Sequence, residues 1–229
     1  MTGVQTCAFR SFVHLALFFD AVFETAKTFK VGDIGIRTLL QDCSVKFCTS
    51  WGNAVVAAHE LIQQGHEAFY GINPQCKDSS GDYGLEYICA FHTEIPFGHG
   101  TQYETLQDVL KTVHDSCFIP GSPSIIVSTD ETIQCLWFLK YPVSVEEAGY
   151  ETLEQVNMDL ASSLGGNMDA CGLTEYFKVP AYEFPLQKVV LISNNRFRYL
   201  PEDFGLNSKV YKKKMSSQNL EDSQHERCE

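Results

Sequence analysis

The sequence has little positive charge: 17 lysines and arginines stand against 29 aspartates and glutamates, giving a formal net charge of −12. Proteins that hold nucleic acid mainly through its phosphates carry the opposite balance, so tight binding of a nucleic-acid backbone by the chain as a whole is disfavoured. A local basic groove is still compatible with this total, because electrostatic attraction depends on where the charges lie.

Signatures of several other protein classes are also missing. The 9 cysteines include no Cys-x-x-Cys pair, which argues against a zinc site or a disulfide framework and for reduced thiols in a cytoplasmic protein. No apolar run reaches about 18 residues, so we expect a soluble protein with no membrane-spanning helix. Neither a Gly-x-x-x-x-Gly-Lys-Ser/Thr loop nor a Gly-x-Ser-x-Gly turn occurs, which disfavours P-loop ATPases and serine hydrolases.

The composition is that of a globular protein. With 229 residues, 44% of them hydrophobic and 12% aromatic, the chain is long enough to bury a sizeable core. Residues 1–8 resemble translated sequencing adapter and are expected to lie outside the fold, while residues 207–229 turn polar, which predicts a disordered tail. We therefore expect one domain over residues 9–206.

Hydrophobic patterns predict helices and strands in irregular alternation. Helices are expected over residues 12–26 and over residues 54–64, the latter with Ser50 as its cap and Gly65 at its end. Two more are expected from a capping box at Thr101-Gln-Tyr-Glu104 and from Ser144. Strands are expected over residues 31–40, 67–72, 85–91, 125–127, 133–139 and 189–192, with 125–127 and 133–139 forming a hairpin. This order favours an α+β fold with a mixed or antiparallel sheet and flanking helices.

Three segments, in order after a helix, glycine and strand stretch, carry a recognisable pattern. The preceding stretch is Leu61–Pro74, which ends in Gly-Ile-Asn-Pro. The first segment is Tyr87-Ile-Cys-Ala-Phe-His-Thr-Glu94, the second is Pro123–Trp137, and the third is Gly165–Pro180. The succession resembles the archaeo-eukaryotic primase superfamily, in its prim-pol and plasmid replication primase branch, over residues 12–192. The resemblance implies a single primase-like catalytic domain, related to the RNA-recognition-motif (RRM) fold.

The first catalytic motif of that family is altered here. The family carries Asp-x-Asp on a strand, because two acids two residues apart face the same side and together hold the Mg²⁺ or Mn²⁺ of nucleotidyl transfer. The corresponding positions read His92-Thr-Glu94. Glu94 and His92 are therefore the predicted metal ligands, although a neutral imidazole suits Mg²⁺ poorly.

The other positions of the family pattern are altered as well. By resemblance, Gln134 takes the place of a phosphate-contacting histidine, and Lys178 takes the place of an arginine. Asn167 and Gly172 stand where the family has acids, and Asp169 is near enough to substitute if the loop shifts. The predicted catalytic residues are thus Glu94, His92 and Asp169, and the predicted nucleotide-binding residues are Gln134, Lys178 and Arg37.

Three functions stay open. The favoured one is a divergent primase-polymerase-like domain of a plasmid, phage or other mobile element, with nucleotidyl transfer lost or weakened. Its expected partners are single-stranded DNA, nucleotides and replication proteins. The second is an active DNA primase or polymerase that uses Mg²⁺ or Mn²⁺ at a remodelled site. The third is an α+β interaction protein unrelated to nucleic acids, which the net charge of −12 keeps in view.

Overall fold

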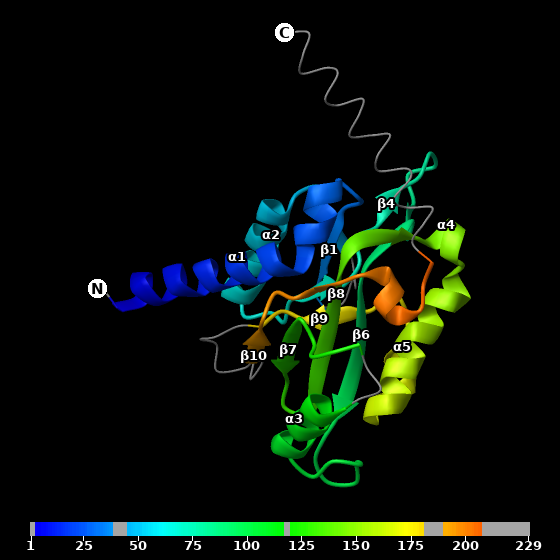
Figure 1. The fold of residues 1–229 in the computed structure, drawn as a ribbon. Coiled ribbons are helices and arrows are strands. Elements are labelled where there is room, and N and C mark those ends of the chain that lie inside the picture. Colours follow the sequence, from blue (N-terminus) through cyan, green and yellow to red (C-terminus); the bar gives the residue numbers. More distant parts are fainter. Residues whose placement is uncertain (1–2, 39–44, 117–119, 181–189, 208–229) are drawn as a thin grey trace.

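Two β-sheets form the framework of the protein, whose computed structural model describes residues 3–38, 45–116, 120–180 and 190–207 (Figure 1). The first sheet, in the order β2-β1-β3-β9, contains β1 (Ile34–Arg37), β2 (Val45–Cys48), β3 (Phe69–Gly71) and β9 (Tyr176–Lys178). The second, in the order β10-β7-β8-β11 with β6 on the other edge of β8, contains β6 (Tyr87–Pro96), β7 (Ile125–Ser128), β8 (Thr132–Ser144), β10 (Val190–Asn194) and β11 (Arg198–Tyr199). Strands β4 (Cys76–Lys77) and β5 (Tyr83–Gly84) form a separate small hairpin.

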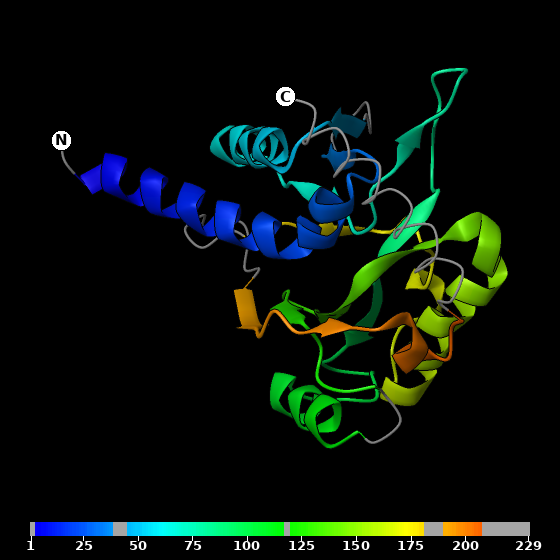
Figure 2. The same ribbon diagram turned by 45° about the horizontal axis from the view of Figure 1, so that its top comes forward.

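The helices pack on both sheets (Figure 2). They are α1 (Gly3–Phe29), α2 (Trp51–Gln63), α3 (Leu106–Asp115), α4 (Val145–Ala148) and α5 (Tyr150–Leu164), with short 3-10 turns η1 (Met168–Ala170) and η2 (Pro201–Phe204). Helices α1 and α2 share one core with the first sheet and with one face of the second, whereas α3 and α5 pack on the opposite face of the second. All strand pairs are antiparallel except β8 with β11, so the predicted α+β fold is confirmed.

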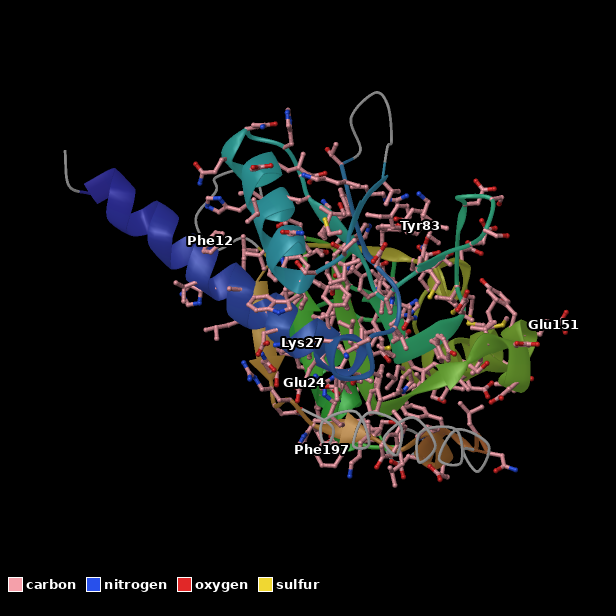
Figure 3. All side chains as sticks on the ribbon, turned by 90° about the horizontal axis from the view of Figure 1, so that it is seen from above. Phe12, Glu24, Lys27, Tyr83, Glu151 and Phe197 are labelled. Atoms are coloured by element: carbon pink, nitrogen blue, oxygen red, sulfur yellow. The ribbon has the colours of Figure 1, made fainter. Side chains whose placement is uncertain are left out.

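Aromatic side chains from α1 dominate the first core, where side chains fill the space between helices and sheets (Figure 3). Phe18, Phe19 and Phe23 surround the Tyr70 ring edge-on, with ring centroids 5.3, 5.8 and 6.2 Å from it. All four rings are buried, and each buried ring of this size stabilises the fold by about 2 to 3 kcal/mol. The helical spacing of these apolar residues therefore docks α1 on β3.

Strand β8 is the central strand of the second sheet and is buried on both faces. Leu136 and Phe138 face the first core, while Ile133, Cys135 and Trp137 face the second. A strand covered on both sides reads in sequence as a continuous apolar run, which is why residues 133–139 predict it. The hairpin predicted from residues 125–139 is present as β7 and β8.

Three other expectations from the sequence concern a capping box, the domain boundaries and membrane-spanning helices, and their outcomes differ. Helix α3 opens at Thr105, whose side chain forms a capping box with Asp108, so the capping box predicted at residues 101–104 is wrong. The predicted boundaries at residues 9 and 206 stay predictions, since α1 already begins at Gly3 and residues 208–229 lie outside the described residues. Within the described ranges, none of the helices has the length and apolar character needed to cross a membrane.

Candidate active site

Glu94 and Gln134 are direct cross-strand partners in the β6–β8 pair. Glu94 is half-buried, whereas Gln134 is buried, and within the described ranges its Oε1 atom has no hydrogen-bond partner. A buried acceptor without a partner costs about 1 to 3 kcal/mol unless a water or a ligand meets it. The antiparallel register therefore places two of the predicted residues side by side, next to an unsatisfied polar atom.

His92 lies on the same face of β6 as Glu94 but is fully buried. Its Nε2 atom is 3.1 Å from the carbonyl oxygen of Ala170, and its Nδ1 atom is 3.3 Å from the side-chain nitrogen of Asn157. One neutral tautomer satisfies both contacts, because Nε2–H donates to the carbonyl while Nδ1 accepts from the amide. Burial lowers the pKa of His92 from 6.5 to about 4, so the ring is neutral at pH 7. A metal ion at His92 would have to displace the partner of one of these ring nitrogens.

Asn157, on α5, ties His92 to the third segment of the pattern. Its Oδ1 atom accepts the backbone N–H of His92 at 2.9 Å, and its side-chain nitrogen donates to the carbonyl of Cys171 at 3.0 Å. Asn157 is completely buried, so these bonds form out of reach of water. Strand β6 and the segment after η1 are thus held at a fixed separation.

Asn73, in the loop after β3, also makes buried hydrogen bonds that join β6 to the third segment. Its Oδ1 atom accepts the backbone N–H groups of Cys89 and Ala90 at 2.8 and 3.0 Å, where the β6–β8 register shifts. Its side-chain nitrogen donates to the carbonyls of Ala90 and Leu173, both at 3.2 Å. The sequence resemblance includes Asn73 in its Gly-Ile-Asn-Pro stretch but assigns it no role; the structure shows a buried amide that joins β6 to the third segment.

The third segment begins with a close approach to β6 at Gly166. The backbone N–H of Asn167 donates to the carbonyl of Glu94 at 2.7 Å. A Cβ atom on Gly166 would lie 3.1 Å from that carbonyl oxygen and 3.0 Å from the Cα atom of Ala161, and it would also meet the Thr93 hydroxyl. Glycine is therefore required here by contact with backbone atoms.

Replacing Gly166 by alanine is expected to lower the free energy of unfolding by about 2 kcal/mol, because the added methyl group overpacks a junction formed partly by backbone. Urea denaturation measures this loss. Gly84→Ala is the matched control, since nothing lies within 4 Å of its Cβ position, and its effect should stay within about 0.5 kcal/mol. Equal effects for the two variants would contradict the close-approach argument.

Among the described residues, Asp169 forms no metal-holding group with His92 and Glu94. It is exposed on η1, and its backbone N–H donates to the side chain of Asn167 at 3.1 Å. A different carboxylate, Glu175, interacts with the site instead. Burial raises the pKa of Glu175, the Arg37 guanidinium lowers it, and the neighbouring Glu94 carboxylate raises it.

Glu175 is a residue that sequence reasoning missed. Its Oε1 atom lies 3.1 Å from the position that a Cβ atom on Gly172 would occupy. The resemblance places an acid at the position of Gly172. Glu175, three residues later in the chain, therefore puts its carboxylate close to the place where that acid is expected. In the sequence, Glu175 is visible only as an acid just before a short strand. Many surface acids occupy such positions, so this feature does not single it out.

Arg37 and Lys178 lie in one row across the first sheet, because Phe69 pairs with both. The Arg37 guanidinium stacks 4.2 Å from the ring centroid of Tyr176, and its Nε atom is buried without a partner among the described residues. Lys178 forms an ion pair with Glu67 at 2.8 Å. Of the two predicted cations, Lys178 is thus paired with a carboxylate, whereas Arg37 keeps an unsatisfied buried donor.

The donors present do not fit a two-metal centre. In the ranges that the structure describes, no three His, Cys, Asp or Glu side chains form a group able to hold a metal ion. His92 has both ring nitrogens bonded and Asp169 is exposed, whereas the Glu94 and Glu175 carboxylates interact electrostatically. Two-metal transfer normally draws on several oxygen ligands.

The arrangement of sheets and helices is an archaeo-eukaryotic primase-like fold. Similar solved structures include the AEP domain of the primase-polymerase of cyanophage S-2L, with a TM-score of 0.54 and 10% identity, covering 81% of this chain and 95% of that one. They also include the primase RepB′, with a TM-score of 0.53 and 12% identity, covering 90% of this chain and 67% of that one. The catalytic domain of RepB′ in complex with initiator DNA matches with a TM-score of 0.50 and 13% identity, covering 90% of this chain and 97% of that one. No protein-family model matches the chain, and no curated protein matches it by sequence.

Proposed function

We propose that the chain is a primase-like domain of a phage or other mobile-element replication system, in which nucleotidyl transfer is lost or weakened and binding of DNA and nucleotides is kept. The observation that carries the proposal is His92. The position at which the resemblance expects the first catalytic acid holds a neutral, fully buried ring with both nitrogens bonded. A hard cation loses one of its two principal oxygen ligands there.

Two unsatisfied polar atoms support retention of binding. They are a buried donor on Arg37 and a buried acceptor on Gln134, and a planar guanidinium suits phosphate groups. One structural neighbour is a primase catalytic domain in complex with initiator DNA, which makes single-stranded DNA a reasonable ligand for this chain. Arg37→Gln should weaken nucleotide binding about tenfold, as expected for loss of one charge-assisted contact.

Primer synthesis and primer extension with Mg²⁺ and with Mn²⁺ test the proposal. We expect product formation at background level, together with measurable binding of single-stranded DNA whose affinity falls as salt rises. Robust extension that is abolished by Glu94→Gln would overturn the loss of activity. The matched control is Glu146→Gln, which changes an exposed acid on α4.

A weakly active enzyme is the second candidate, and Glu175 is the observation that favours it. Its carboxylate interacts with that of Glu94 and lies close to the Gly172 position, so two acids stand at the site. If this candidate holds, a low extension rate should fall to background in both Glu94→Gln and Glu175→Gln and persist in Glu146→Gln and Asp169→Asn.

An interaction protein unrelated to nucleic acids is the third reading. It predicts that binding of single-stranded DNA is absent or does not change between low and high salt, since no phosphate contacts would release counterions. Fluorescence anisotropy with a labelled oligonucleotide at several salt concentrations separates this reading from the other two.

A further inference from the structure

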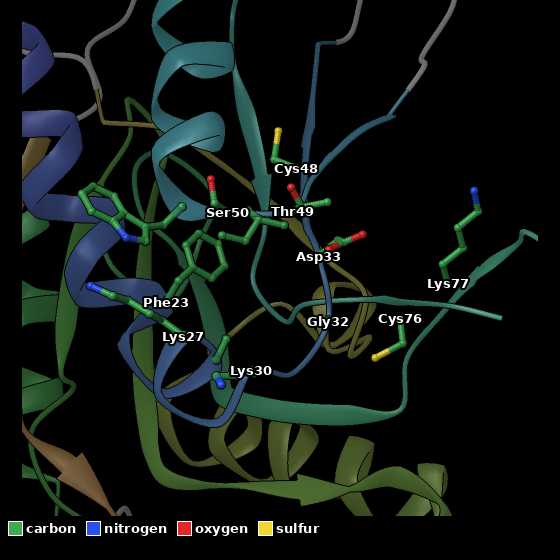
Figure 4. A pocket seen from close by; sticks show the side chains of 13 residues that line it. Phe23, Lys27, Lys30, Gly32, Asp33, Cys48, Thr49, Ser50, Cys76 and Lys77 are labelled. Atoms are coloured by element: carbon green, nitrogen blue, oxygen red, sulfur yellow. The ribbon is translucent and has the colours of Figure 1, made fainter. Parts of the chain in front are cut away.

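A pocket of about 550 Å³ lies apart from the candidate active site (Figure 4). It is formed by the last turns of α1, the loop into β1, the junction of β2 and α2, and strand β4. None of its lining residues belongs to the candidate active site. Its volume falls within the range of about 300 to 1,000 Å³ that is common for small-molecule sites.

The lining of this pocket is basic in a strongly acidic chain. Lys27, Lys30 and Lys77 line it together with a single acid, Asp33. The Asp33 carboxylate already accepts the hydroxyl of Tyr83 at 3.0 Å. Three lysines against one partly engaged aspartate contrast with the formal charge of −12 for the whole protein. The pocket therefore attracts anions.

Two of these lysines have charges that are not used in ion pairs with described residues. Lys27 lies 3.6 Å from Asp20 and 5.1 Å from the ring centroid of Trp51, so its charge is partly used. Across the described part of the chain, Lys30 and Lys77 form no ion pair, and both are exposed. Their ammonium groups can turn to a ligand without breaking an existing contact.

Lys30 also occupies a backbone position that favours glycine. Its φ angle is 53°, directly after the end of α1, where glycine is the common residue. A lysine there costs stability relative to glycine, which is consistent with a side chain retained for its charge. Across the pocket, α2 begins with Ser50 as its N-cap and has no acid in its first turn, so its positive end is not neutralised.

We propose that this pocket binds a phosphate-bearing ligand of nucleotide size. Lys30 and Lys77 supply the charge, the start of α2 adds backbone N–H groups, and Trp51 supplies an apolar wall. The phosphate belongs either to a free nucleotide or to the 5′ end of a DNA strand. The proposal is independent of the function proposed for the site that contains Glu94.

Titration with ATP, followed through tryptophan fluorescence, tests the proposal. The chain has two tryptophans, and Trp137 is fully buried with its indole N–H bonded to the Gly121 carbonyl, so a ligand-induced change reports mainly on Trp51. We expect a saturable change that weakens about tenfold in Lys30→Gln and further in the Lys30→Gln, Lys77→Gln double variant. Lys111→Gln, an exposed lysine on α3, is the matched control.

Competition with an oligonucleotide in its 5′-phosphate and 5′-hydroxyl forms identifies the source of the phosphate. Displacement of ATP by the 5′-phosphate form alone assigns the pocket to a strand end, whereas equal, weak competition by both forms assigns it to a free nucleotide. An ATP signal that survives unchanged in the double lysine variant would overturn the proposal, because ATP would then bind outside this pocket.

Lys30→Gly provides a second, independent readout. It removes the charge and relieves the left-handed backbone, so we expect a higher urea midpoint together with weaker ATP binding. A merely structural role for Lys30 predicts unchanged ATP binding in this variant, and that result would also count against the proposal.

Discussion

Replacing Asn73 by alanine is expected to lower the free energy of unfolding by about 4 kcal/mol, the largest single loss that we foresee from an uncharged substitution. The side chain satisfies four backbone groups, namely the N–H groups of Cys89 and Ala90 and the carbonyls of Ala90 and Leu173. All four lie where water has little access, so removing the amide leaves buried donors and acceptors unmet. Urea denaturation, followed by circular dichroism, measures the change.

Asn53→Ala is the control for this experiment. Asn53 is an exposed residue in the first turn of α2, so the same chemical change there should alter stability by no more than about 0.5 kcal/mol. A loss below about 1 kcal/mol for Asn73→Ala would mean that waters take over the four contacts, and the amide would then not be the element that fixes β6 against the third segment.

Restoring the acid of the family pattern with His92→Asp is expected to damage the protein instead of repairing it. The new carboxylate would be fully buried, and the donor beside it, the Asn157 amide, is neutral and does not balance its charge. An unpaired buried charge costs about 3 to 5 kcal/mol. His92→Asn, which is similar in shape and carries no charge, should lose less, and the difference between the two variants at pH 7 measures the charge alone.

The pH dependence of stability should have opposite signs in the wild type and in the His92→Asp variant. In the wild type the pKa of His92 is lowered to about 4, so below pH 6.5 the unfolded chain binds a proton that the native protein excludes. About 3 kcal/mol of stability is therefore lost between pH 6.5 and about pH 4. In His92→Asp, burial should raise the pKa of the new acid. This variant should therefore lose stability as pH rises and the acid is forced to ionise. Urea titrations at several pH values, with His92→Asn as the reference, test both signs; parallel curves would contradict the burial argument.

Much of the fold follows from local sequence. The apolar run 133–139 and the turn before it predict the β7–β8 hairpin, and Ser50 and Gly65 bracket α2 with a cap and a left-handed residue. These signals succeed because the period of the side chains and the backbone preferences of a few residues decide such elements. The capping box at residues 101–104 fails because a better one, Thr105 with Asp108, begins four residues later.

The site is less predictable because it depends on paths that loops take. Asp169 and Glu175 are both acids in the third segment, and η1 turns the first toward solvent while the start of β9 carries the second toward Glu94. Likewise, the sequence places His92 at a ligand position but does not contain the information that Asn157, 65 residues away, holds its ring. Tertiary hydrogen bonds of this kind leave no local pattern.

The bond between Asn73 and Leu173 joins residues that are 100 positions apart in the chain. Contacts of such span form slowly, because a long loop must close before they contribute. We therefore expect the hairpin of β7 and β8 to be established early in folding and the junction between β6 and the third segment to be completed last. Changes at Asn73 should then accelerate unfolding far more than they slow folding, so this amide acts mainly on the lifetime of the folded state.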